Sequence, residues 1–453
     1  MMDQVDLMSS SLLPMNLNTD YPVIVRAEGR HLYAADGRVY LDGASGGVGA
    51  VNIGHAVPEV LAAIAEQSQK VCHANVSLFM NAAALELAEL IVQEFAPEQM
   101  NKVYFVSTGT EATELCVKFA RVYHLYQGHP ERSKIISRWS GYHGSSLAAL
   151  SFSGRTSRRT DFQPYYFPSI RIRPAYHFRD GRGMSEEAYA QVCARDLEDA
   201  IVREVPETVS CFIAEPFVNT MGACPAPADY FELVREICDR YGVLMISDEV
   251  VTGYGRTGQR FGIDHWNTVP DLIACGKGLS GGYSPIACAI VHDKIWDVLK
   301  SHPSGNTVAG YTHAANPLSA ATAKAVLRYI CDHDLVTRSA QIGEHLQGLL
   351  RHRLGDHPHV GDIRGRGCHM ALEFVTDRDS LGCYPENVNK AGEVYTACMA
   401  EGLNLCPVHG DADGLRGDSI IVKPAFTFTD AELDELVDKL VAGIERVRWQ
   451  VDS

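Results

Sequence analysis

The sequence feature that most constrains the fold is an alternation of short apolar segments and helical segments that begins near residue 101. Apolar runs predict strands at residues 102–106, 134–137, 211–215, 243–247, 271–275 and 286–291. Apolar residues at helical spacing between 112 and 123, and a helix expected at 229–240, lie between these strands. Such alternation builds a mostly parallel sheet covered by helices, so we expect an α/β fold.

The chain beyond about residue 330 has a different pattern. Helices are expected at 335–354, 387–401 and 430–450, around short strands at 369–375 and 419–422. Near the N-terminus, Asp36-Gly37 predicts a β-hairpin, and Pro58 suits the first turn of a helix. We therefore expect a large domain of residues 73–330 and a smaller α+β domain built from residues 1–72 and 331–453.

Composition narrows the function classes. The 453 residues carry a net charge of −16, which disfavours a nucleic-acid partner. The first residues are acidic where a signal peptide would be basic, and no apolar run approaches the ~20 residues of a membrane span. The 13 cysteines are scattered without a Cys-x-x-Cys pair, and the 18 histidines form no His-Glu-x-x-His motif. We expect a cytoplasmic protein with reduced thiols, no membrane contact and no metal site.

Two residues after predicted strands carry the main chemical signal. Lys277 lies between two glycines, so its amine can reach a ligand without crowding. Asp248 follows a buried apolar run, where it can hold a cationic partner. Pyridoxal phosphate (PLP) needs both groups, because a lysine forms its Schiff base and a carboxylate keeps its pyridine nitrogen protonated. The pair predicts a PLP enzyme.

Two turns provide supporting motifs. Segment 107–111 (Ser-Thr-Gly-Thr-Glu) opens a helix, and Thr108 with Glu111 has the pattern of a capping box. Free N–H groups and the helix dipole favour a phosphate there, although the segment also fits a plain helix cap. Segment 139–144 (Trp-Ser-Gly-Tyr-His-Gly) exposes an aromatic ring that could stack on a flat heterocycle or belong to the core. Because these turns and Glu215 follow strands, we expect them to meet Asp248 and Lys277 at one edge of the sheet.

Two other motifs indicate competing functions. Segment 253–258 matches the G-x-G-x-x-G dinucleotide fingerprint, but no helical period follows it, so we interpret it as a loop. Segment 278–282 matches the G-x-S-x-G elbow of a serine hydrolase with Ser280 as nucleophile. That elbow requires a helix directly after the serine, whereas two glycines and Pro285 follow here. A serine hydrolase remains a remote alternative.

Taken together, these residues resemble the class III aminotransferases, fold type I PLP enzymes that include ornithine, GABA and ω-amino-acid transaminases. The resemblance runs from about residue 41 to 321, with a weaker tail to 428. Its specific segments are 246–250 (Ile-Ser-Asp-Glu-Val), 253–258 (Gly-Tyr-Gly-Arg-Thr-Gly) and 276–278 (Gly-Lys-Gly). It implies a large domain with a mostly parallel sheet sandwiched by helices, and a smaller α+β domain.

The resemblance implies roles for individual residues. Lys277 would form the Schiff base and then move the substrate proton, and Asp248 would pair with the pyridinium nitrogen. Val250 and Tyr142 would pack on opposite faces of the cofactor ring. The remaining cofactor contacts implied are Gly109, Thr110, His143 and Glu215.

Thr312 matches the family's threonine that reaches the phosphate of a neighbouring subunit. This match implies a homodimer with shared active sites, and a tetramer built from such dimers is also possible.

Some positions depart from the family. Thr220 replaces a glutamate of GABA and ornithine members, and Lys423-Pro424-Ala425 stands where a double proline is common. Arg416 is a candidate for binding a substrate carboxylate. It directly precedes Gly417-Asp418, whereas the family's arginine lies a few residues before Gly-Asp, and a surface arginine is the alternative. Segment 46–49 (Gly-Gly-Val-Gly) has no bulky aromatic residue, unlike many ω-transaminases, so we hypothesise a substrate pocket that admits large compounds.

The function expected is a PLP-dependent aminotransferase. It would move an amino group from an amine or amino acid to a keto acid or aldehyde by a ping-pong mechanism. The same lysine and aspartate could instead support a PLP-dependent racemase, epimerase or aminomutase. The sequence names neither donor nor acceptor.

Overall fold

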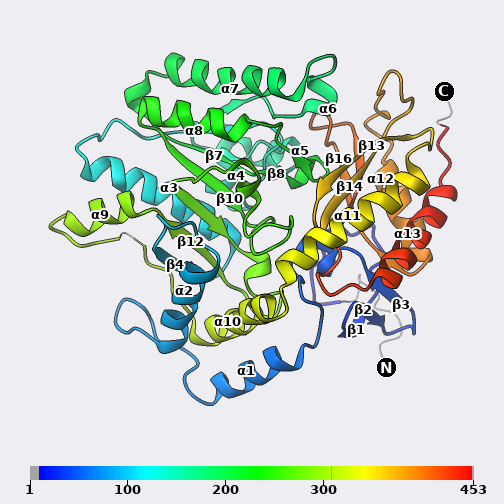
Figure 1. Cartoon of the computed structure of the whole chain (residues 1–453), viewed down its shortest axis with the longest axis horizontal. Helices are drawn as coiled ribbons and strands as arrows, with labels where there is room; N and C mark the ends of the chain where they lie inside the picture. The colour runs from blue at the N-terminus through cyan, green and yellow to red at the C-terminus, as the bar shows by residue number, and fades with distance from the viewer. Residues whose placement is uncertain (1–9, 308, 451–453) are drawn as a thin grey trace.

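The computed structural model describes residues 10–307 and 309–450, and a seven-stranded sheet lies at its centre (Figure 1). In spatial order its strands are β4 (Lys102–Val106), β12 (Ala287–Val291), β11 (Leu272–Cys275), β10 (Leu244–Glu249), β7 (Val209–Ala214), β5 (Lys134–Arg138) and β6 (Ile170–Ile172). From β11 to β6 all neighbours pair in parallel, whereas β12 is antiparallel to both β11 and β4. The predicted mostly parallel sheet is confirmed.

Both faces of this sheet are covered because every strand between its edges is apolar on both sides. In β10, Leu244 and Ile246 pack in one core cluster with α3 (Gly109–Tyr126), while Met245 belongs to a second cluster on the other face. The first face is completed by α4 (Leu147–Phe152) and α9 (Asp293–Ser301). The second carries α7 (Glu186–Arg203), α8 (Tyr230–Tyr241), α2 (Ala82–Glu94) and α10 (Pro317–Asp332). The alternation follows from the two-residue period of a strand.

A four-stranded antiparallel sheet lies beside the central sheet, on the right of Figure 1. Its order is β13 (Val360–Arg366), β14 (His369–Phe374), β17 (Asp418–Val422) and β16 (Cys406–His409). Around it pack α11 (Leu335–Leu354), α12 (Lys390–Ala400) and α13 (Asp430–Glu445). α13 ends at Glu445, earlier than the predicted 450, and Trp449 beyond its end stacks on His359 with ring centroids 5.1 Å apart.

The two ends of the chain meet in a further small sheet. The predicted hairpin is confirmed as β2 (His31–Ala34) and β3 (Val39–Asp42), and β1 (Ile24–Glu28) pairs with β2. β15 (Leu403–Asn404) extends this sheet by pairing with β3 in parallel. The helix α1 (Pro58–Ser68) begins at the predicted proline and packs on α10.

Shorter elements complete the described residues. They are α5 (Thr156–Arg159), α6 (His177–Asp180), β8 (Phe217–Val218), β9 (Cys224–Pro225) and the short turns η1 (Ser45–Gly49), η2 (Thr160–Tyr165), η3 (Pro206–Thr208), η4 (Asn219–Met221), η5 (Gly262–Trp266) and η6 (Lys277–Leu279). None of the helices in the described part of the chain is long and apolar enough to cross a membrane.

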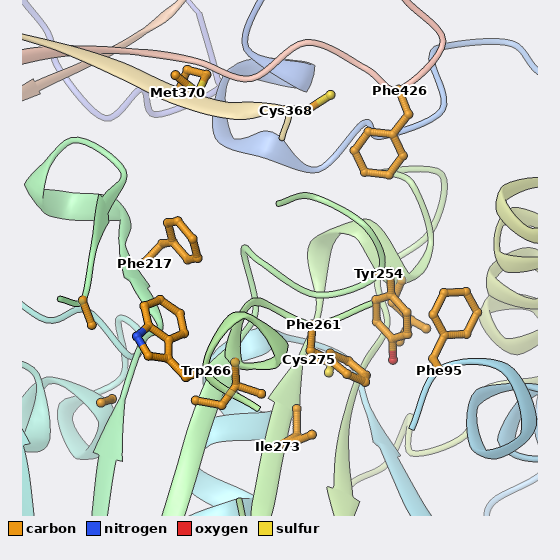
Figure 2. Packing of buried hydrophobic residues seen from close by; sticks show 14 of the residues in the cluster. Phe95, Phe217, Tyr254, Phe261, Trp266, Ile273, Cys275, Cys368, Met370 and Phe426 are labelled. Atoms are coloured by element: carbon orange, nitrogen blue, oxygen red, sulfur yellow. The ribbon is translucent and has the colours of Figure 1, made fainter. Parts of the chain in front are cut away.

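Aromatic packing joins the central sheet to the second sheet. Figure 2 shows Phe217, Tyr254 and Trp266 on loops of the central sheet, with Phe426 and Met370 from the later part of the chain on the opposite side. The Phe217 and Trp266 rings meet edge to face with centroids 5.7 Å apart. This continuous core holds the loops at the carboxyl ends of the strands against the second sheet.

Candidate active site

The strand ends bring the candidate residues to one edge of the sheet. Asp248 is the penultimate residue of β10, and Lys277 follows the end of β11 by two positions. The register pairs Asp248 with Ala274 of β11 and pairs Ser247 with Ala214, the residue before Glu215. Because these strands are parallel, their carboxyl ends and the loops after them face the same side.

Asp248 is held by two hydrogen bonds in a buried position. His143 Nδ1 lies 2.7 Å from Asp248 Oδ2, and the Val250 N–H donates to Oδ1 at 3.1 Å. The His143 and Asp248 side chains are only 1% and 4% exposed. The Ser153 hydroxyl accepts the His143 N–H at 2.9 Å, which fixes the ring from the backbone side. These contacts fix the orientation of the Asp248 carboxylate.

Lys277 is partly exposed and carries backbone strain. Its φ is 38°, in the left-handed region that a non-glycine residue enters only when the surrounding structure requires it. Burial lowers the pKa of its amine, and the charges of Asp248 and Glu215 oppose that shift. Within residues 10–307 and 309–450, no hydrogen bond or ion pair engages the Lys277 amine. The amine is therefore available to a ligand.

Glu215 links the turn after β5 to the turn after β7. Its Oε1 accepts the Tyr142 N–H at 2.9 Å, and its Oε2 accepts the Asn219 N–H at 3.2 Å. Burial raises the pKa of Glu215, with a further contribution from the negative charge of Asp248. The Tyr142 backbone is thereby positioned, while its hydroxyl contacts Ser145 Oγ at 2.6 Å.

The start of α3 is the helix N-terminus at which the sequence predicts an anion. A capping box forms as expected, with the Thr108 hydroxyl accepting the Glu111 N–H at 3.2 Å. The N–H groups of Gly109 and Thr110 belong to the first turn of α3, where backbone N–H groups have no acceptor within the helix. A Cβ on Gly109 would lie 2.7 Å from Val250 Cγ1, so only glycine lets the helix start approach Val250 this closely.

Two residues that the sequence predicts for the site do not contact Asp248, Lys277, His143 or Glu215 within the described residues. Thr312 lies exposed in a turn, where its carbonyl accepts a hydrogen bond from Asn75 Nδ2 at 3.3 Å. Arg416 is exposed and forms an ion pair with Asp413 at 2.7 Å.

The competing motifs lack the geometry they require. No helix follows Ser280, and its hydroxyl donates to the Ser284 carbonyl at 2.5 Å instead of to a base. Residues 250–260 form turns, so no helix N-terminus lies at the glycines of 253–258. No cluster of three or more candidate metal ligands occurs in the part of the chain that the structure describes.

Sequence reasoning missed several residues around this edge. Ser153 and Asn219 hold His143 and Glu215, but a polar residue in a loop gives no signal of its partner. Lys423 was noted only as a departure from a proline, yet it is fully buried. The available signal was its place directly after the apolar run at 420–422, since a lysine there continues a buried strand.

The buried aspartate, the free lysine amine and the open helix start are the groups that a PLP site on a fold type I scaffold requires. Residues 15–444 match the family model for class III aminotransferases, and the chain belongs to that family. The aminotransferase YodT of Bacillus subtilis, described as uncharacterized, is 37% identical over 97% of this chain and 99% of its own length. A diaminobutyrate–2-oxoglutarate transaminase of Halomonas elongata is 34% identical over 94% of this chain and 90% of its own length.

Solved structures agree with the family. An amine transaminase from an uncultivated Pseudomonas species, solved in its PLP-bound form, has a TM-score of 0.89 and 30% identity, with 97% of both chains covered. Class III aminotransferases depend on PLP, and this protein is a PLP-dependent aminotransferase. The prediction of cofactor, fold and class of reaction is confirmed.

Proposed function

We propose that the sheet-edge site moves an amino group from an amine or amino acid to a keto acid or aldehyde, with Lys277 and Asp248 as its catalytic residues. The observation that carries this assignment is the unengaged Lys277 amine at the same strand edge as the buried, oriented Asp248. The surrounding residues fit PLP. Gly109 leaves room at the helix start, Val250 lies against it, and the helix N–H groups suit a phosphate.

When bound, PLP accepts the amino group and withdraws electrons from the substrate carbon that bears it. Asp248 would hold a proton on the pyridine nitrogen, because a buried carboxylate stabilises a cation at that point. His143 keeps the carboxylate oriented through the 2.7 Å contact. Gly109 and Thr110 would bind the phosphate, and Tyr142 and Val250 would enclose the ring.

Lys277 would transfer the proton during each half-reaction. Its lowered pKa favours the neutral amine, which can take the proton from the substrate Cα as general base. The same amine can then deliver that proton to the cofactor instead of returning it to Cα, and water supplies the oxygen with which the donor leaves as a carbonyl compound while its nitrogen stays behind. A keto acid or aldehyde entering next would reverse these transfers and leave as the amine.

The test uses purified protein supplied with PLP and a panel of amines and amino acids, with pyruvate or 2-oxoglutarate as acceptor. We expect nitrogen transfer to the acceptor by the wild type and none by Lys277→Ala. Asp248→Asn should retain PLP contacts but lose most of the rate. Loss of substrate chirality without nitrogen transfer would instead establish the racemase or epimerase alternative, and migration of the amino group within one substrate would establish an aminomutase.

We also place the active sites at the interface of a homodimer. The apolar side chains of Leu78, Phe79 and Met80 are 76%, 62% and 72% exposed, and Asn75 ties this segment to the Thr312 turn. A second copy covering this surface would bring Thr312 to the phosphate of its partner. Light scattering should give the mass of at least a dimer, and Phe79→Glu should lower both that mass and PLP retention. A fully active monomer would contradict this proposal.

Other assignments remain proposals for separate tests. We propose that residues 73–330 form the cofactor domain and that residues 1–72 and 331–453 form the small domain. All 13 cysteines are free thiols, which supports a reducing cytoplasmic location. Arg416 is proposed as an accessory contact for a substrate carboxylate, for which it would have to leave Asp413.

A further inference from the structure

Lys423 is a buried cation without a counter-ion. It follows β17 directly and is fully buried. Its amine contacts the Cys406 thiol at 3.9 Å, and no carboxylate forms an ion pair with it within residues 10–307 and 309–450. Burying a charged amine without a partner is costly, so its pKa falls toward the neutral form unless an opposite charge reaches it.

The loop η1 (Ser45–Gly49) holds this lysine in place. The Lys423 N–H donates to the Gly43 carbonyl at 2.7 Å, and the Ser45 hydroxyl donates to the Lys423 carbonyl at 2.6 Å. A Cβ on Gly49 would lie 3.0 Å from Lys423 Cδ and 3.9 Å from its Nζ. The lysine stem therefore occupies space that a side chain at position 49 would otherwise take.

The same segment contacts the turn that carries Lys277. The Asn52 side chain donates to the Gly278 carbonyl at 3.0 Å, and a Cβ on Gly282 would lie 3.0 Å from Val51 Cγ2. Residues 45–52 thus touch both Lys423 and the turn of Lys277. Burial lowers the pKa of Lys423 to about 8, and the positive charge of Lys277 contributes to that shift.

The other titratable groups facing Lys423 do not neutralise it. Arg256 donates to neutral acceptors, including the Pro424 carbonyl at 2.8 Å and the Gly49 carbonyl at 3.3 Å. His369 is fully buried, and neither of its ring nitrogens has a hydrogen-bond partner. Burial, together with the neighbouring cations, lowers the pKa of His369 well below its ordinary value. Lys423 therefore has Arg256 and an uncharged His369 near it and gains no counter-ion from either residue.

Asp42 is the carboxylate whose charge acts on Arg256, but it has partners of its own. It accepts the Gly46 N–H at 2.6 Å and the Asn404 side-chain N–H at 2.9 Å. It therefore does not serve as the counter-ion of Lys423.

We propose that Lys423 binds a carboxylate of the amino-acid or keto-acid substrate, which lies along the loop η1 with its reacting end at Lys277. The inference rests on the proposed function and deepens it, because it makes carboxylate-bearing compounds the preferred substrates. A simple alkylamine brings no charge to satisfy the Lys423 ammonium. The glycines at 46–49 then serve to admit the lysine stem and the substrate chain.

The kinetic test compares Lys423→Met with wild type in the PLP-loaded enzyme. Donors are a homologous series of ω-amino carboxylates and the n-alkylamines of matching chain length. We expect Lys423→Met to lower kcat/KM about tenfold or more for the best carboxylate donor, mainly through KM, as loss of a charge-assisted hydrogen bond predicts. Alkylamines should react as well as before or better. Lys423→Arg should keep part of the preference for carboxylate donors over alkylamines. Arg416→Met, assayed in the same way, tests the exposed arginine as the other candidate for binding the carboxylate.

A second readout does not depend on turnover. Calorimetry near pH 8 measures the binding of unreactive n-alkyl carboxylates, with phosphate and chloride as anion controls. Because a bound carboxylate favours the ammonium form of Lys423, wild type should take up protons on binding, and Lys423→Met should bind weakly without uptake. Equal binding of phosphate or chloride would show a general anion site and overturn substrate recognition.

The outcomes separate this inference from the proposed function. Amino transfer with unchanged carboxylate preference in Lys423→Met would overturn the role of Lys423 alone. Equal losses for amines and amino acids would also overturn it, since they would indicate a structural role. If Lys423→Met fails to fold, the absence of proton uptake by wild type would still refute the proposal. If wild type transfers nitrogen from no donor, the proposed function fails, and the calorimetry still tests Lys423.

Discussion

The buried ion network around Glu373 should be a main source of stability for the second sheet. Glu373 on β14 is fully buried and accepts hydrogen bonds from Arg364 on β13, from the Tyr176 hydroxyl and from Arg179 at 2.5 Å. Arg364 also donates to the Gly222 carbonyl at 2.8 Å and to the Met221 carbonyl at 2.6 Å. It therefore ties the second sheet to the loop after β8.

Replacing Arg364 with methionine keeps much of the side-chain volume but removes the charge and both carbonyl contacts. Removing one member of a buried ion pair costs about 3–5 kcal/mol, because the remaining charge loses its partner. Unfolding entropy of about 2.1 cal/mol/K per residue gives roughly 1 kcal/mol/K for this chain of 453 residues. Arg364→Met should therefore lower Tm by about 3–5 °C if the chain unfolds as one unit.

Scanning calorimetry of the PLP-loaded protein measures this difference, and Arg353→Met is the matched control. Arg353 pairs with Asp438 at 2.6 Å on the surface, with side chains 40% and 62% exposed. Such a pair contributes about 0–1 kcal/mol, so Tm should move by less than about 1 °C. Replacing Arg364 and Glu373 together with apolar residues should restore part of the loss. Equal shifts for Arg364→Met and the control would refute the reasoning.

The pH dependence offers an independent check. Burial raises the pKa of Glu373, but the Arg364 and Arg179 guanidinium groups more than compensate and hold it below its ordinary value. A carboxyl with a lowered folded pKa contributes stability above its unfolded pKa of about 4.3 and loses it as the pH falls further. The advantage of wild type over Arg364→Met should therefore shrink in acid. A constant difference down to strongly acidic pH would contradict the ion-pair explanation.

Three further outcomes follow from the site. Gly109→Ala should weaken PLP retention, because its Cβ would lie 2.7 Å from Val250, whereas Gly348→Ala in the open should leave retention unchanged in dialysis. Lys423→Met should raise Tm below pH 8, because burial lowers the pKa of this amine from 10.5 to about 8 and so destabilises the folded protein by about 3 kcal/mol there. The increase in Tm should fade between pH 8 and 10.5, where the unfolded chain also loses the proton. A lower Tm for Lys423→Met below pH 8 would contradict this reasoning. His143→Phe should lower the amino-transfer rate while PLP stays bound, because Asp248 loses its 2.7 Å contact; an unchanged rate in stopped-flow assays would refute the orienting role.

The sequence alone predicted six of the seven strands of the central sheet and the two residues proposed to carry the chemistry, but it missed the edge strand β6. These features are local: strand and helix periods are written in neighbouring residues, and Asp248 and Lys277 each follow a recognisable apolar segment. The capping box at Thr108 and the hairpin at Asp36-Gly37 were predicted for the same reason, since each needs only a few adjacent residues.

Tertiary structure alone decided which side chains are partners and which are buried. His143 and Asp248 are 105 positions apart, and only strand register brings them together. Arg416 and Lys423 are only seven positions apart, yet Arg416 is exposed beside Asp413 and Lys423 is fully buried. The physical reason is that burial and charge pairing depend on how distant elements pack, which no local pattern of a lysine or arginine encodes.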